Sequence, residues 1–142
     1  MGNDKITAYF LRVSEDGETI YEGYLGEIED TLKAKQDYVN FGKEGGLIQC
    51  VSLTDEIDVI CNDEGKLLNF PPNRAWLYKG RMADIFCGNI LCVRHEGDMF
   101  TSIRKEDVPV VEGILKPICG GGMLAKWEDS FETADKTGES QG

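Results

Sequence analysis

The chain has 142 residues with 26 acidic and 15 basic side chains, so its formal net charge is −11 and its pI is about 4.5. A single domain of this length buries enough apolar surface to fold without disulfides or metals. The acidity argues against a protein that binds double-stranded DNA by neutralising its phosphates, and it disfavours adsorption to anionic lipid. No apolar run approaches the ~20 residues of a membrane span, and residues 1–5 lack the pattern of a signal peptide, so we expect a cytoplasmic protein without membrane contact.

The negative charge is distributed unevenly along the chain. Residues 1–64 carry a net charge of −10, residues 65–119 a net charge of +2, and residues 120–142 a net charge of −3. One interpretation is a solvated surface that keeps the protein soluble. The other is an interaction face for a basic partner, which includes a mimic of the phosphate backbone of DNA. The sequence leaves both open, and each assumes that the two halves are not interleaved in space.

The first 42 residues predict a β-hairpin followed by a helix. Residues 6–13 and 19–25 are rich in β-branched and aromatic side chains, and the turn signal at residues 15–17 separates them. Residues 27–40 then carry an apolar stripe at helical spacing with acidic residues in the first turn, and Gly42 follows the last turn. We therefore expect an amphipathic helix over residues 27–40.

The middle of the chain predicts three more strands, an irregular connection and a second helix. Strands are expected at residues 47–53, 57–61 and 89–94, of which the last is apolar enough to be buried on both faces. Residues 71–76 are expected to form a loop, because two prolines disfavour a helix interior and a central strand. The second helix is predicted over residues 105–115.

This order of elements predicts an α+β domain over residues 1–119. We expect a mostly antiparallel sheet of about five strands with two helices packed on one face. Residues 120–142 are acidic and rich in glycine, which is typical of a flexible C-terminal tail. Within that tail, residues 124–131 either dock as a short helix or do not, and the sequence leaves this open.

The five cysteines predict neither disulfides nor a metal site. They contain no C-x-x-C pair and lie mostly in apolar runs, as expected for reduced thiols of a protein core. Cys87, Cys92 and His95 are the only potential metal ligands at short spacing, and three such residues alone do not form a zinc pattern. No metal and no cofactor are therefore expected. The cysteines are Cys50, Cys61, Cys87, Cys92 and Cys119.

No catalytic constellation is apparent in the sequence. His95 is the single histidine, and its place in the turn-like segment of residues 94–98 predicts a solvated loop residue. The three glycines at residues 120–122 are not followed by the lysine and hydroxyl residue of a phosphate-binding loop. Basic and aromatic residues alternate only at Trp76, Tyr78, Lys79 and Arg81, the one place where a single-stranded nucleic acid could bind. We therefore expect a protein that is not an enzyme.

Four segments between residues 47 and 108 carry a family resemblance. They read Asn-Asp-Glu-Gly-Lys-Leu at 62–67, Phe-Pro-Pro-Asn-Arg at 70–74, Asp-Ile through Gly-Asn-Ile-Leu at 84–91, and Gly-Asp-Met-Phe-Thr-Ser at 97–102. In this order they resemble domain-of-unknown-function family 3846, whose members occur in phages, plasmids and conjugative elements of bacteria. The resemblance implies a mobile-element context, and it implies neither an activity nor a catalytic residue.

The strongest candidate binding residues are Pro72, Asn73, Arg74 and Trp76. Two prolines fix the backbone, so that Asn73 and Arg74 present amide and guanidinium donors to a carboxylate, a phosphate or a partner backbone. The alternative is structural: Asn73 caps a turn and Arg74 pairs with a nearby acidic group.

Two hypotheses for the function follow from these features. The first is a non-enzymatic interaction module of a mobile element, which binds a host or element protein through an acidic surface, with counter-defence such as antirestriction as one form. The second is a small-ligand or nucleotide-binding domain that uses the Pro72-Asn73-Arg74 loop. The second hypothesis requires a concave pocket beside Arg74.

Overall fold

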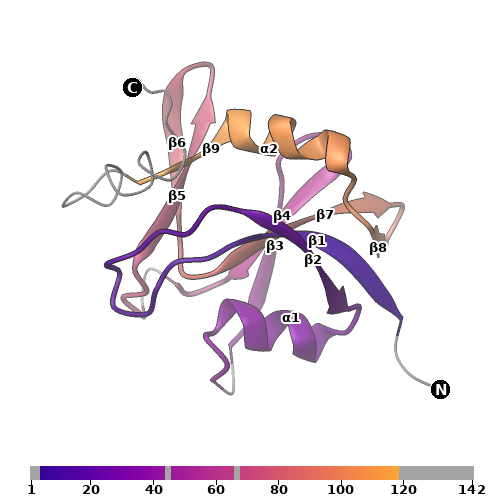
Figure 1. Ribbon diagram of the computed structural model, residues 1–142, viewed down its shortest axis with the longest axis horizontal. Coiled ribbons are helices and arrows are strands. Elements are labelled where there is room, and N and C mark those ends of the chain that lie inside the picture. Colours follow the sequence, from indigo (N-terminus) through magenta and orange to yellow (C-terminus); the bar gives the residue numbers. More distant parts are fainter. Residues whose placement is uncertain (1–3, 44–45, 66–67, 119–142) are drawn as a thin grey trace.

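The computed structural model describes residues 4–43, 46–65 and 68–118. The expected flexible tail at 120–142, with its possible helix at 124–131, lies outside these residues, as does Cys119. Nine strands, two α-helices and one turn of 3₁₀-helix are described (Figure 1). In chain order they are β1 (Lys5–Leu11), β2 (Tyr24–Glu29), α1 (Leu32–Val39), β3 (Ile48–Ser52), β4 (Ile57–Asn62), β5 (Pro72–Tyr78), β6 (Arg81–Cys87), β7 (Ile90–Glu96), β8 (Met99–Thr101), the 3₁₀ turn (Lys105–Asp107), α2 (Val108–Ile114) and β9 (Leu115–Pro117).

The larger sheet has the order β2-β1-β7-β4-β3, and β8 also pairs with β7. All its pairs are antiparallel, as the sequence predicts. β7 lies at its centre because residues 90–93 are apolar on both faces and are fully buried there. Since β7 comes from the second half of the chain and its neighbours β1 and β4 from the first, the two halves are interleaved. The charge division along the sequence is therefore not a division in space.

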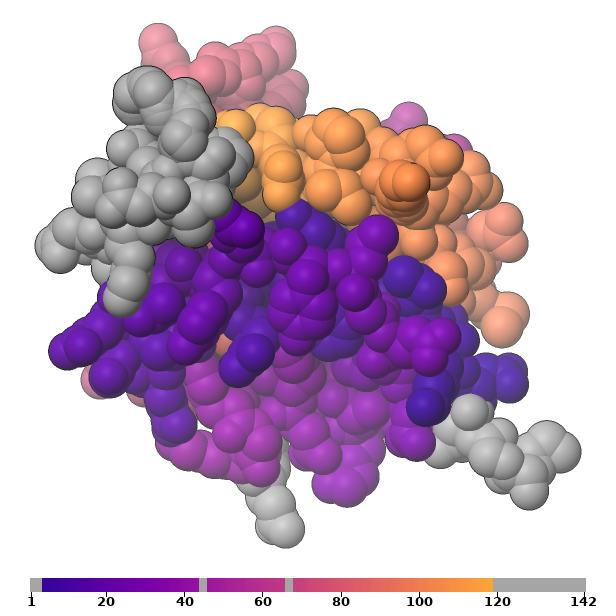
Figure 2. All heavy atoms as spheres, viewed as in Figure 1, coloured from indigo at the N-terminus to yellow at the C-terminus, as the bar shows by residue number. Residues whose placement is uncertain are grey.

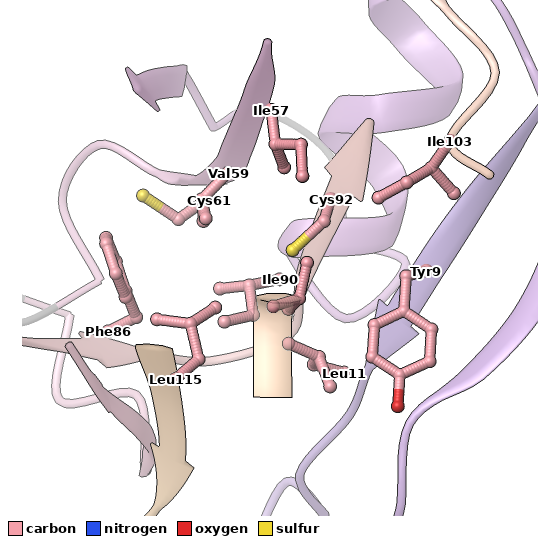
Figure 3. Packing of buried hydrophobic residues seen from close by; sticks show 11 residues of the cluster. Tyr9, Leu11, Ile57, Val59, Cys61, Phe86, Ile90, Cys92, Ile103 and Leu115 are labelled. Atoms are coloured by element: carbon pink, nitrogen blue, oxygen red, sulfur yellow. The ribbon is translucent and has the colours of Figure 1, made fainter. Parts of the chain in front are cut away.

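Each face of the larger sheet is covered by a different helix. α2 contributes Val111 to the apolar cluster on one face, and α1 contributes Val39 to the cluster on the other. Figure 1 shows the two helices on opposite sides of the sheet, and Figure 3 shows the cluster on the α2 side. The prediction of two helices on one face is therefore wrong. Successive residues of β1 and of β7 supply opposite clusters, as the alternation of a β-strand requires.

A second, three-stranded sheet with the order β6-β5-β9 was not expected. Its central strand β5 contains the segment predicted as a loop, so that prediction is wrong. Pro72 is the first residue of β5, where its missing N–H breaks no ladder, and Pro71 precedes the strand. β5 and β6 are joined by Lys79 and Gly80, which both have positive φ, as a tight two-residue hairpin requires.

The first helix is shorter than predicted. Residues 24–29 form β2 and pair with β1, which displaces the expected second strand of the hairpin toward the C-terminus. α1 then begins at Leu32, where the Thr31 side chain accepts a hydrogen bond of 3.1 Å from the Ala34 N–H. In the second helical region, Pro109 occupies the first turn of α2, where a proline is tolerated.

The cysteines only partly follow the prediction of core thiols. Cys61 and Cys92 are buried and Cys87 is half-buried, but Cys50 is exposed on the edge strand β3. None of the helices in the described ranges has the length and hydropathy needed to span a membrane.

Candidate ligand-binding cavity

A β-bulge near the start of β5 turns two adjacent polar side chains into the protein. Pro72 is paired with Cys87 and Arg74 with Phe86, so Asn73 is the extra residue on β5. A bulge of this kind breaks the alternation of a strand, which explains why Asn73, Arg74 and Ala75 are all buried. Two residues of the predicted binding set thus lie inside the protein.

Asn73 is fully buried and uses its amide to join three parts of the chain. Its Nδ2 donates to the carbonyl oxygens of Leu11, at 2.9 Å, and Gly88, at 2.8 Å. Its Oδ1 accepts a hydrogen bond of 2.7 Å from Nη1 of Arg74. Both ends of the amide are therefore satisfied, as a buried side chain requires. Asn73 therefore has a structural role, and its amide is not available to donate a hydrogen bond to a ligand.

Arg74 is 3% exposed and carries its charge into the interior. Besides the bond to Asn73, Nη2 donates to the carbonyl oxygen of Tyr21 at 2.9 Å. Burial lowers the pKa of Arg74 to about 10, although Tyr9 and Glu112 nearby act in the opposite direction. The guanidinium remains charged at neutral pH, and no ion pair joins it to a carboxylate among residues 4–43, 46–65 and 68–118. The expected structural pairing of Arg74 with an acidic group is not found there.

Arg74 lies in the wall of a cavity of about 550 Å³. The cavity is bounded by the segment before β2, by α2 and by β9, and Figure 2 shows the orange atoms of α2 against the indigo and purple atoms of the N-terminal hairpin. Its volume is within the range of sites for small molecules. The lining residues with charge are Glu22, Arg74, Glu112 and Lys116, and the apolar ones are Leu11, Pro109, Val111, Leu115 and Pro117, with Gly23 and Gly113 between them.

Tyr9 fixes one of the acidic side chains of this cavity. Its hydroxyl donates a hydrogen bond to Oε2 of Glu112 on α2, and Figure 3 shows Tyr9 at the margin of the apolar cluster. Burial is the main cause that raises the pKa of Tyr9, and the bond to Glu112 adds to it, so the hydroxyl remains a donor. A Cβ at Gly23 would collide with the hydroxyl end of this ring. The absence of a side chain at residue 23 thus lets the cavity wall close over Tyr9.

The structure does not bring all four predicted binding residues together. Pro72 is exposed at the start of β5, and Trp76 lies along a separate groove of about 670 Å³ with Leu53, Tyr78 and Lys79. Trp76 stacks on Phe86 at 6.1 Å between ring centroids, which gives it a place beside the core. Only Arg74 of the four lines the cavity, and Asn73 supports it.

Three charged residues that line the cavity, Glu22, Glu112 and Lys116, were not found from the sequence, and neither was Tyr9, which holds Glu112. Glu112 and Lys116 reach the site because α2 and β9 pack against β1 and β5. No short motif contains any of these residues, so no local signal could have identified them.

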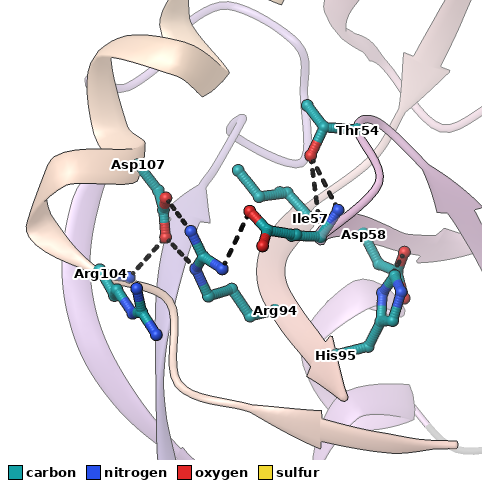
Figure 4. A network of polar contacts seen from close by, with 8 residues as sticks. Thr54, Ile57, Asp58, Arg94, His95, Arg104 and Asp107 are labelled. Carbon is teal, nitrogen blue, oxygen red and sulfur yellow. Dashed lines mark hydrogen bonds and ion pairs between the residues drawn. The ribbon is translucent and has the colours of Figure 1, made fainter. Parts of the chain in front are cut away.

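The single histidine lies in a strand and not in the predicted turn. His95 belongs to β7, and its Nδ1 is 3.1 Å from Oδ1 of Asp58 on β4. Its side chain is 28% exposed, so the prediction of a solvated loop histidine is wrong. Figure 4 shows the pair beside a separate polar network around Arg94. Among the residues that the structure describes, no three potential metal ligands come together.

Several acidic side chains of the first half are engaged in ion pairs. Glu15 contacts Lys43, and Asp37 is 3.3 Å from Lys33. Other carboxylates, such as those of Glu27 and Glu29 on β2, are exposed. β2 ends the order of the larger sheet, so these two glutamates mark an acidic edge.

A family model described as a domain of unknown function, DUF3846, matches residues 10–116. The match extends well beyond the segments that suggested it and includes Arg74, Glu112 and Lys116. No curated protein and no solved structure matches the chain.

Proposed function

The chain belongs to the DUF3846 family, a domain of unknown function, and from its geometry we propose a small-ligand-binding domain whose cavity holds an anionic group against Arg74. This is the second of the two functions expected from the sequence. Its site is a cavity beside strand β5, where a loop was expected.

The observation that carries the proposal is the buried guanidinium of Arg74, which forms no ion pair with a carboxylate of the described residues. Burying a charge is costly unless the charge is paired, and a neutral amide and a carbonyl oxygen only solvate it. A guanidinium presents five N–H donors in a fixed plane, which suits a carboxylate or a phosphate. An anion that enters the cavity would be the ion-pair partner that this guanidinium lacks among the described residues.

The proposal is tested with three anions on the full chain: inorganic phosphate, AMP and 3-phenylpropionate. We expect at least one to raise the melting temperature in a concentration-dependent way and to give a saturable signal in titration calorimetry. A cavity-filling variant, Gly113→Phe, should abolish the binding, because a Cβ at Gly113 meets open space beside the cavity. The proposal fails if none of the three anions binds, or if the Gly113→Phe variant binds equally well.

The matched control is Leu32→Phe. Leu32 is 59% exposed on α1, on the opposite face of the sheet, so this variant adds a similar aromatic group without approaching the cavity. It should bind the anion as the unaltered chain does. A loss of binding in both variants would point to a general effect of the added ring and would contradict the proposal.

A second proposal keeps the interaction module expected from the sequence. We propose that the edge strand β2 takes up an extended basic segment of a host or element protein. Support comes from the exposed Glu27 and Glu29 and from the place of β2 at the end of the sheet order, because an edge strand pairs with an added strand. Opposite charges would favour basic partners. A counter-defence role would follow if that partner were a defence protein.

An eight-residue peptide of alternating lysine and valine tests this edge by fluorescence anisotropy. Binding should weaken at least tenfold between 0.05 and 0.5 M salt and should be lost in the double variant Glu27→Lys, Glu29→Lys. The double variant Asp63→Lys, Glu64→Lys changes the net charge equally at an exposed turn away from β2 and serves as the control. Equal losses in the two double variants would contradict docking at β2.

A further inference from the structure

The charged residues that line the cavity restrict the class of ligand further than a requirement for an anion. Arg74 and Lys116 supply two positive charges, and Glu22 and Glu112 supply two negative ones. The cavity as a whole is therefore close to neutral, although it contains a buried cation. A ligand that carries only negative charge would gain from Arg74 and be repelled by two carboxylates in the same space.

We infer that the ligand is a small zwitterion with an apolar body, which places its carboxylate on Arg74 and its ammonium group against Glu112 and Glu22. The inference rests on the proposed function and names the chemical class of the ligand. A phosphate ester is disfavoured, because its second negative charge would increase the repulsion from these two glutamates. A monoanionic carboxylate matches the planar guanidinium and adds the least repulsion.

The two glutamates differ in how firmly they are held. Tyr9 donates to Oε2 of Glu112, and this bond orients the carboxylate while Oε1 takes no part in it. Glu22 is exposed on the segment before β2 and has no such anchor in the described contacts. Glu112 is therefore the fixed acceptor for an ammonium group, and Glu22 lies at the rim as a second one.

The apolar part of the wall favours a ligand with a hydrocarbon or aromatic body. Leu11, Val111 and Leu115 belong to the core cluster and also line the cavity, and two prolines extend this surface. Removing apolar surface from water is favourable, so a phenyl or isobutyl group adds affinity that a bare zwitterion lacks. An apolar amino acid combines all three features.

Three related probes test the contributions of the ammonium group and the carboxylate separately. They are L-phenylalanine, 3-phenylpropionate, which lacks the ammonium group, and phenethylamine, which lacks the carboxylate. Titration calorimetry on the full chain should show phenylalanine binding at least tenfold more tightly than either of the others. The Glu112→Gln variant should reduce this advantage of phenylalanine over 3-phenylpropionate at least threefold, and glycine should bind more weakly than phenylalanine. Glutamine keeps an acceptor for Tyr9, so the variant preserves that contact.

The control is Glu96→Gln, which removes one negative charge from the exposed end of β7 outside the cavity and should leave the ratio unchanged. Equal binding of phenylalanine and 3-phenylpropionate would overturn the inference, yet would support the proposed anion site. Failure of phenylalanine alone also overturns the inference. The proposed function is judged separately, by the binding of phosphate, AMP and 3-phenylpropionate and by the Gly113→Phe variant.

Discussion

Asn73 accepts a hydrogen bond of 2.7 Å from Nη1 of Arg74, the residue that follows it on β5. Adjacent residues of a regular strand point to opposite faces, so the contact depends on the bulge between Pro72 and Arg74. The consequence is a guanidinium that is positioned by a neutral side chain and keeps its full charge. A regular β5 would direct one of the two side chains to the opposite face.

Replacing Asn73 by alanine should destabilise the fold by about 3 kcal/mol. The change leaves the carbonyl oxygens of Leu11 and Gly88 without their buried donor and removes the acceptor of Arg74. Urea unfolding monitored by fluorescence gives the difference. Gln49→Ala, which removes an exposed amide on β3, should change the stability by less than about 0.5 kcal/mol. A loss below 1 kcal/mol at Asn73 would show that these bonds contribute little.

The two lysines of α1 are expected to differ sharply. Lys35 is 3% exposed, donates to Oδ1 of Asp30 at 2.6 Å and lies 4.9 Å from the centre of the Phe100 ring. Its replacement by alanine leaves a partly buried carboxylate unpaired and should cost about 2–3 kcal/mol. Lys33→Ala removes only an exposed ion pair and should cost about 0.5 kcal/mol or less. Thermal unfolding compares the two variants, and similar melting temperatures would contradict the expectation.

The strands of the larger sheet were largely predictable from the sequence. β3, β4 and β7 lie within two residues of the predicted segments, because alternating or continuous apolar residues between turn signals identify buried strands. The start of α1 was not predictable in the same way. Ile28 fits a helical stripe and also the alternation of a strand, and pairing with β1 decides in favour of the strand.

The site was predictable only in part. Arg74 was found because an arginine beside two prolines and an asparagine is an unusual cluster of donors. Its surroundings depend on the pairing of β5 with β9 and on the docking of α2, which join residues about 40 and 100 positions apart. The loop prediction was wrong because a proline is tolerated at the first residue of a strand, and Pro72 is the first residue of β5.

Two glycines of the cavity wall should respond in opposite directions to alanine. A Cβ at Gly113 meets nothing within 4 Å, so Gly113→Ala should stabilise α2 by about 0.7 kcal/mol through its higher helix propensity. A Cβ at Gly23 would overlap the ring of Tyr9, so Gly23→Ala should destabilise the fold by about 2 kcal/mol or more. Calorimetric melting measures both changes. A destabilised Gly113→Ala variant would contradict the open space beside the cavity.

Because of the polar network in Figure 4, the stability of the fold should decrease at acid pH. Asp107 accepts hydrogen bonds from Nε of Arg94 at 2.7 Å, from Nη2 of Arg94 at 2.8 Å and from the N–H of Arg104 at 2.9 Å. These bonds lower the pKa of Asp107, and those from Arg94 are the largest cause. The carboxylate is thus more acidic in the folded chain than in the unfolded chain.

A carboxylate with a lowered pKa stabilises the fold above its unfolded value, about 3.9, and this contribution is lost as the pH falls through the folded value. At pH 7, Asp107→Asn should therefore be less stable than the unaltered chain by about 2 kcal/mol. The difference should shrink below about pH 4, because protonation of Asp107 in the unaltered chain weakens the same bonds. Urea unfolding at intervals from pH 7 to pH 2 measures the difference, with Asp98→Asn at an exposed turn as the control. A difference in stability that stays constant down to pH 2 would mean that the negative charge of Asp107 does not stabilise this network.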